Sequence, residues 1–104
     1  MPTEILVFYV PAGTLDAAEA LGRAAVEAGL AACANLFPVQ SAYLWNGAMQ
    51  DDEEVVVILK TFPEKEAALE AFLTSHHPYE VPALVRWPAR VNDAYADWMR
   101  SVIR

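Results

Sequence analysis

The sequence predicts an α+β domain in which an antiparallel four-stranded sheet carries two helices on one face and ends in a third helix. Three observations lead to this prediction. Continuous apolar runs rich in β-branched residues alternate with stretches of helical spacing. Asn46-Gly47 marks a tight turn between two extended stretches. The 104 residues, 56% of them hydrophobic, suit one compact domain spanning positions 1–104.

The first half of the chain is predicted as strand, helix and strand. Residues 5–10 form an unbroken apolar run, which is typical of a strand buried on both faces. Thr14 is a good N-cap, and leucine and alanine then recur at helical spacing as far as Gly29, where the helix should stop. Residues 31–45 are extended. Pro38 within them indicates an edge strand or a bulge, because proline cannot donate to a ladder.

The returning strand is predicted at residues 55–61. The acidic run at 51–54, which precedes it, is interpreted as a solvated loop. Lys60 lies at the end of this apolar strand. A buried amine there suggests either an ion pair with Glu54 or Glu80, or a lysine that binds a ligand.

A second helix is expected to begin near Pro63. A stiff connection through Pro78 and Pro82 should then lead to a fourth strand at residues 83–87. Asn92 is expected to cap the last helix. The inner face of that helix should carry one apolar stripe, formed by Tyr95, Trp98, Met99 and Val102. The complete order is β-α-β-β-α-β with an added helix, which is the ferredoxin-like split βαβ arrangement.

Composition limits the possible functions. The net charge of −7 and only seven lysines and arginines argue against nucleic-acid binding. The single cysteine excludes a disulfide within one chain. Every apolar run is too short to cross a bilayer, and the start of the chain lacks the features of a secretory signal. We therefore expect a cytoplasmic protein with neither nucleic acid nor a membrane as partner.

The predicted strands contain more apolar surface than one chain can cover. Residues 5–10 and 55–59 do not alternate between apolar and polar positions, as a half-exposed sheet would. Two helices cover one face, and one short terminal helix is too small for the other. The remaining patch would exceed what monomers usually expose, so we expect a homo-oligomer.

The stretch from His76 to Glu80 is the strongest candidate for a metal site. It places two imidazoles, His76 and His77, next to Pro78, Tyr79 and Glu80. Cu(II), Zn(II) and Ni(II) favour imidazole nitrogen combined with oxygen ligands. Capping of a helix C-terminus by histidine explains the pair equally well. Two adjacent histidines are not a complete site, so further ligands would have to come from elsewhere.

Two other pairs of residues, one polar and one aromatic, have both a functional and a structural interpretation. Cys33 lies between alanines and shares a strand face with Asn35, and its simplest interpretation is a small core residue. Tyr43 and Trp45 share a face of the hairpin, where packing is a more common role than ligand binding.

These motifs, in this order, resemble the CutA family of divalent-cation tolerance proteins. The resemblance extends over nearly the whole chain. Its motifs are Leu30 to Asn35, Tyr43-x-Trp45-x-Gly47, Glu54 through Lys60-Thr61, His77 to Pro82, and then Asn92, Tyr95 and Trp98. It implies a ferredoxin-like homotrimer with interlocking hairpins and a cytoplasmic role in tolerance to copper and other divalent metals.

The resemblance also implies site residues. Clefts between subunits would gather the residues that match the family motifs, here Cys33, Asn35, Tyr43, Trp45, Lys60, His77 and Tyr79 together with Glu80. Copper-binding members resemble this chain at His76 and His77. They also carry a cysteine at the end of the first strand, where this chain has Val10, so weak rather than tight copper binding is expected.

Three functional hypotheses follow. The first is a non-enzymatic trimer of divalent-metal homeostasis, with copper as the main candidate ion and zinc or nickel as others. The second is a signalling trimer similar to the PII proteins, whose cleft would hold a small anionic metabolite through Tyr43, Trp45, Lys60 and Tyr79. The third, an enzyme with Cys33 as nucleophile and His77 as base, is disfavoured because the sequence offers no third group to orient the base.

Overall fold

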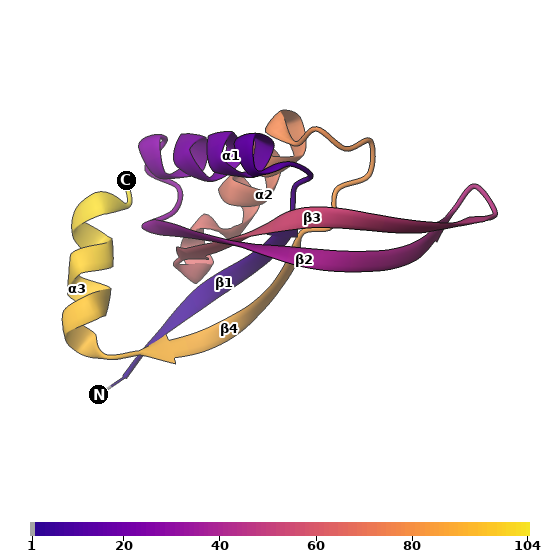
Figure 1. The fold of residues 1–104 in the computed structure, drawn as a ribbon. Coiled ribbons are helices and arrows are strands. Elements are labelled where there is room, and N and C mark those ends of the chain that lie inside the picture. The colour runs from indigo at the N-terminus through magenta and orange to yellow at the C-terminus, as the bar shows by residue number, and fades with distance from the viewer. Residues whose placement is uncertain (1) are drawn as a thin grey trace.

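The computed structural model describes residues 2–104 and shows an α+β fold with a four-stranded antiparallel sheet and three helices, as the sequence predicts. The elements follow one another in the expected order (Figure 1). They are β1 (Thr3–Pro11), α1 (Leu15–Glu27), β2 (Cys33–Trp45), β3 (Ala48–Thr61), a 3-10 turn (Pro63–Lys65), α2 (Glu66–His76), β4 (Val85–Val91) and α3 (Asp93–Val102). None of the helices in this described part is long and apolar enough to cross a membrane.

The strands lie in the order β2-β3-β1-β4, and each neighbouring pair is antiparallel. β2 and β4 are therefore the two edges. Pro38 lies in β2 and Pro88 in β4. An edge strand has one unpaired side, so a residue without an N–H group is tolerated there. The interpretation of Pro38 as an edge residue is confirmed.

One face of the sheet packs against α1 and α2 (Figure 1). Phe8 and Val10 of β1 are fully buried in this core. Gly22 brings α1 close to the sheet: a Cβ atom at this position would lie 2.9 Å from the Cβ of Ala34 and 3.1 Å from Cγ1 of Val57. The small side chains of α1 thus let it pack closely on the sheet. Thr14 also caps the helix as predicted, since its hydroxyl accepts a hydrogen bond from the Ala17 N–H.

The opposite face is only partly covered. α3 packs over Ile5 and Val7 through Met99. Beyond it, the ring of Tyr9 contacts those of Phe37 and Trp87, at centroid distances of 6.2 and 6.4 Å. Phe37 and Trp87 are 38% and 42% exposed. We call these three residues the aromatic row. One short helix does not hide the second face, as the sequence analysis expects.

β2 and β3 continue beyond the rest of the sheet as a two-stranded arm (Figure 1). β1 pairs with β3 only as far as Val56, so residues 39–54, which we call the hairpin arm, have no third strand beside them. The arm makes the molecule elongated, with extents of 47 × 24 × 22 Å. At its tip Asn46 and Gly47 both have positive φ, 53° and 79°, as the predicted tight turn requires.

Three predicted boundaries or faces are wrong. β3 begins at Ala48 rather than at residue 55, so the acidic run 51–54 is strand and not loop. Charged side chains are tolerated in this part of the strand because the arm lies outside the core. β4 spans Val85–Val91 rather than 83–87, because Pro88 fits an edge position. Trp98 is 45% exposed and contacts Tyr95, so it lies outside the buried stripe of α3. Asn92 does occupy the N-cap position, but its side chain makes no capping hydrogen bond.

Candidate functional site

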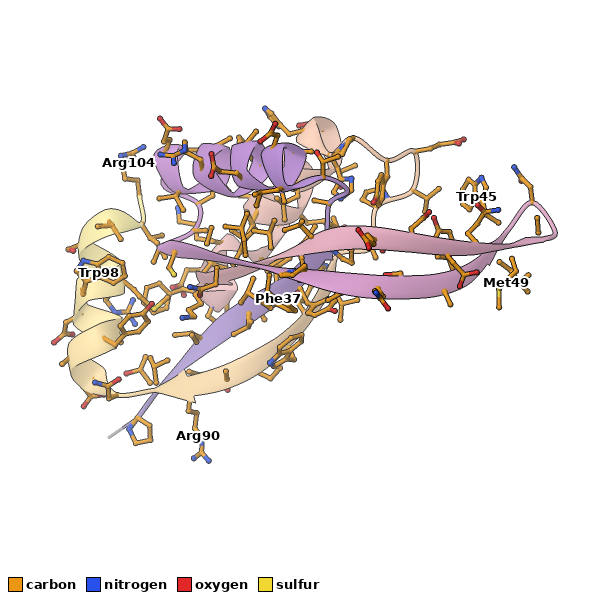
Figure 2. The ribbon with its side chains drawn as sticks, in the orientation of Figure 1. Phe37, Trp45, Met49, Arg90, Trp98 and Arg104 are labelled. Carbon is orange, nitrogen blue, oxygen red and sulfur yellow. The ribbon has the colours of Figure 1, made fainter. Side chains whose placement is uncertain are left out.

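A cleft of about 500 Å³ lies between the hairpin arm and the loop that follows α2. The arm contributes aromatic and acidic side chains, and the loop contributes proline, tyrosine and small apolar residues. Figure 2 shows Trp45 on one side of the arm and Met49 on the other. The lining residues of this cleft, which we call the arm cleft, are Pro11, Tyr43, Trp45, Glu54, Pro78, Tyr79, Glu80, Val81 and Ala83.

Two phenol–carboxylate pairs define the polar part of this region. Tyr79 donates a hydrogen bond from its hydroxyl to Oε1 of Glu54 at 2.6 Å. Tyr43 donates to Oδ2 of Asp52. Asp52 and Glu54 are two residues apart in β3, so strand alternation places both carboxylates on the same side of the arm. Glu54 is the more buried, with only 9% of its surface exposed.

These pairs keep both phenols protonated. Burial raises the pKa of Tyr79 well above its usual value, and the hydrogen bond to Glu54 and the charge of that carboxylate raise it further. The hydrogen bond to Asp52 raises the pKa of Tyr43, and desolvation adds to it. Both tyrosines therefore act as neutral hydrogen-bond donors at neutral pH.

The raised pKa of Tyr79 predicts a pH dependence of stability. Above pH 10.0, the usual pKa of tyrosine, an unfolded Tyr79 ionises while the folded one keeps its proton. Unfolding then releases a proton, so the stabilisation from this phenol is complete below pH 10.0 and is lost as the pH rises further. We expect urea denaturation between pH 9 and pH 11 to show a smaller loss of stability in Tyr79→Phe than in the wild type. Equal slopes for the two proteins would contradict this prediction.

His77 fixes the loop that carries Tyr79. Its Nε2 lies 2.8 Å from the carbonyl oxygen of Pro11, and its Nδ1 accepts a hydrogen bond from the Tyr79 N–H at 3.0 Å. A carbonyl oxygen can only accept, so Nε2 carries the proton and Nδ1 carries the lone pair. His77 is 9% exposed. Both ring nitrogens are used by the backbone, so the ring ties the loop to the end of β1.

His76 has the opposite tautomer. Its Nδ1 lies 2.8 Å from the carbonyl oxygen of Phe72 and therefore carries the proton, while Ser75 Oγ lies 2.9 Å from the same nitrogen. The ring stacks on Phe72 at a centroid distance of 4.0 Å and is exposed. Of the two imidazoles, only that of His76 keeps a ring nitrogen, Nε2, with a free lone pair. The two adjacent histidines therefore differ: His77 holds the loop through both ring nitrogens, whereas His76 has an accessible Nε2.

The remaining candidate residues lie at the other end of the hairpin. Cys33 pairs with Lys60 across β2 and β3, and its thiol is 3.4 Å from Oδ1 of Asn35. Ten residues of strand, about 33 Å, separate Cys33 from Tyr43. Within one chain the predicted cleft set is therefore divided. Tyr43, Trp45, Tyr79 and Glu80 line the arm cleft, whereas Cys33, Asn35 and Lys60 do not.

Two pairings that the sequence left open are not formed within one chain. Lys60 makes no ion pair with Glu54 or Glu80; its ammonium lies 5.4 Å from the ring centre of Tyr95. Cys33 does not contact His77, because its thiol faces Asn35 and both His77 nitrogens bond to backbone groups. The nucleophile-and-base pair of the enzyme hypothesis is therefore not assembled. Cys33 is also half-buried rather than a core residue.

Sequence reasoning missed Glu54 as a cleft residue. Its acidic neighbours favour the interpretation of residues 51–54 as a solvated loop. A signal was nevertheless present, because Glu54 directly precedes the apolar run of β3. Extending the strand by three residues would have placed Glu54 and Asp52 on one face.

The fold and the cleft thus define a small α+β protein with an acidic and aromatic cleft between a long hairpin and a proline-containing loop. The family description "CutA1 divalent ion tolerance protein" matches residues 6–102. Protein CutA of Homo sapiens is 36% identical in an alignment 104 positions long, which covers 98% of this chain and 58% of the human protein. The divalent-cation tolerance protein CutA of Thermus thermophilus is 35% identical in an alignment 100 positions long, which covers 94% of this chain and 95% of that protein.

Solved structures agree with the sequence comparison. The structure of CutA from Synechococcus elongatus has a TM-score of 0.95 and 37% identity, and the match covers 100% of this chain and 95% of that one. The chain therefore belongs to the CutA family of divalent-cation tolerance proteins. It spans about three fifths of the length of the human and mouse relatives that it matches.

Proposed function

We propose that the chain is a non-enzymatic protein of divalent-cation tolerance that binds copper weakly, with zinc or nickel as other candidate ions. Membership of the CutA family over residues 6–102 is the observation on which this proposal depends. The accessible imidazole of His76 supports it, because a ring whose Nδ1–H is held by a backbone carbonyl is oriented to offer Nε2 to a metal.

A metal bound at His76 would need ligands from more than one chain. Residues 2–104 contain no group of three or more histidine, cysteine, aspartate or glutamate side chains placed to hold a metal ion. His77 is occupied by its backbone contacts. Incomplete coordination within one chain, together with Val10 at the end of β1, is consistent with weak binding.

We further propose that the chain forms a homotrimer of the ferredoxin-like class. Two features support assembly. The aromatic row leaves Phe37 and Trp87 exposed on the uncovered face of the sheet. The hairpin arm exposes large apolar side chains near its tip, namely Leu44, Trp45 and Met49. Exposed apolar surface that is continuous over several elements marks contact sites in soluble proteins.

Calorimetric titration with Cu(II) tests the metal part of the proposal. We expect the wild type to give a saturable heat and His76→Ala to bind at least about tenfold more weakly, because the only imidazole nitrogen that is free in this pair is lost. Thr74→Ala is the matched control, since Thr74 is exposed in the same last turn of α2. The absence of heat above buffer in the wild type, or equal heats in wild type and His76→Ala, would remove the proposed role.

The anionic-metabolite alternative is not favoured by the arm cleft. Its charged lining residues are Glu54 and Glu80, and within one chain the lysine expected to hold an anion, Lys60, lies at the other end of the hairpin. The cytoplasmic location stays a prediction. Relatives carry both "periplasmic" and "chloroplastic" in their names, so the family name does not specify a compartment.

A further inference from the structure

The tip of the hairpin arm contains an Asn-Gly pair, the only one in the sequence. Asn46 is followed by glycine, whereas Asn35 and Asn92 are followed by leucine and aspartate. Because glycine has no side chain, its backbone nitrogen can closely approach the side-chain carbonyl carbon of the asparagine before it. Attack of that nitrogen on that carbon is the first step in the spontaneous loss of an asparagine amide.

Both reacting groups are accessible in the structure. Asn46 is exposed, and neither its side-chain amide nor the Gly47 N–H forms a hydrogen bond with any of residues 2–104. The space around Gly47 is open, since a Cβ atom at this position would have no heavy atom within 4 Å apart from its chain neighbours. Water therefore reaches both groups, and no packed side chain hinders their approach.

The turn has to open before the two groups can join. Asn46 and Gly47 hold the positive φ angles of a two-residue hairpin turn, 53° and 79°. Closing a five-membered ring between neighbouring residues fixes the backbone dihedral between them, so the turn geometry must be given up. Within residues 2–104 only the pairing of β2 with β3 holds the turn, because the arm has no third strand. Local opening at such a tip costs little free energy.

We propose that Asn46 is a site of spontaneous modification, at which the amide is converted to isoaspartate and aspartate. The Gly47 nitrogen bonds to Cγ of Asn46 and gives its proton to water, while the side-chain nitrogen takes up a proton and leaves as ammonia. The product is a cyclic imide, which water then opens. Cleavage of the bond between Cγ and the nitrogen gives aspartate. Cleavage on the other side of the nitrogen gives isoaspartate, in which the main chain runs through the former side chain.

Either product changes the tip of the arm. Each adds a negative charge to a chain whose net charge is already −7. Isoaspartate also lengthens the main chain by a carbon atom, so the turn no longer matches the pairing of Trp45 with Ala48. We therefore expect the tip to lose order as the protein ages. This inference depends neither on metal binding nor on the trimer, because it needs only an exposed turn.

Incubation of the folded protein at mildly alkaline pH, followed by tandem mass spectrometry of its peptides, tests the proposal. We expect Asn46 to lose its amide at least about tenfold faster than Asn35 and Asn92 in the same sample, because only Asn46 precedes glycine. A methyltransferase specific for isoaspartate should label the peptide that contains Asn46. The same chain in urea gives the rate without the turn, and the folded rate should lie within about tenfold of it.

Asn46→Gly is the matched control, because glycine adopts the positive φ of this position and has no amide to lose. Its arm peptide should gain neither the mass change at position 46 nor the methyl label. Equal rates at the three asparagines would overturn the proposal. So would an Asn46 amide that persists in the folded chain, or a methyl label that is equally strong in the wild type and in Asn46→Gly.

Discussion

Replacing Phe8 with alanine is expected to lower the free energy of unfolding by about 3–5 kcal/mol. Phe8 is fully buried near the middle of β1, between the sheet and the two helices that cover it. Its ring also lies 5.1 Å from the guanidinium carbon of Arg86, which joins β4 to α2 through Glu66 and Glu70. Removing the ring leaves a cavity where these elements meet and takes away the surface on which Arg86 rests.

Equilibrium unfolding in urea, followed by circular dichroism at a fixed chain concentration, measures this effect. Leu15→Ala is the control, because Leu15 is 59% exposed at the start of α1. It should change the free energy of unfolding by no more than about 0.5 kcal/mol. A loss of less than about 1 kcal/mol in Phe8→Ala would show that Phe8 does not occupy the centre of the core.

The double variant Phe37→Asp/Trp87→Asp is expected to convert the proposed trimer into single chains that remain folded. Phe37 and Trp87 lie on opposite edge strands of the same sheet face and are linked by Tyr9. If a neighbouring copy covers this face, each aspartate would be buried there without a partner. An uncompensated buried charge costs several kcal/mol, and it would be repeated at each contact between chains.

Light scattering over a range of concentrations gives the mass, and circular dichroism reports whether the chain stays folded. Leu15→Asp is the control, because it places the same charge on an exposed leucine of the helix-covered side of the molecule. Its mass should equal that of three wild-type chains. A wild-type mass of one chain, or an unchanged mass in the double variant, would rule out an interface at the aromatic row.

Local signals predicted most of the fold. The apolar run of β1, the Thr14 cap and the Asn46-Gly47 turn each depend on a few neighbouring residues, and the structure confirms all three. The errors concern surroundings that no short segment reveals. The acidic residues 51–54 suit a strand only because the hairpin arm lies outside the core.

The candidate site was less predictable because its contacts are distant in sequence. Tyr79 reaches Glu54 across 25 positions, and His77 reaches Pro11 across 66. The opposite tautomers of His76 and His77 also depend on which backbone groups each ring meets, so two identical neighbours in the sequence differ in what they can bind. Motif resemblance grouped Tyr43, Trp45, Tyr79 and Glu80 with Lys60, but it could not show that within one chain the first four line the arm cleft while Lys60 lies at the other end of the hairpin.

The hairpin arm has a consequence for how the protein reaches its final form. A ribbon of two strands is only marginally stable in water by itself, and residues 39–54 have neither a third strand nor a helix beside them. The ribbon would then become rigid only when it docks onto another copy, so its order would depend on the protein concentration. At low protein concentration the ribbon would lose its order, and one wall of the arm cleft would lose its order with it.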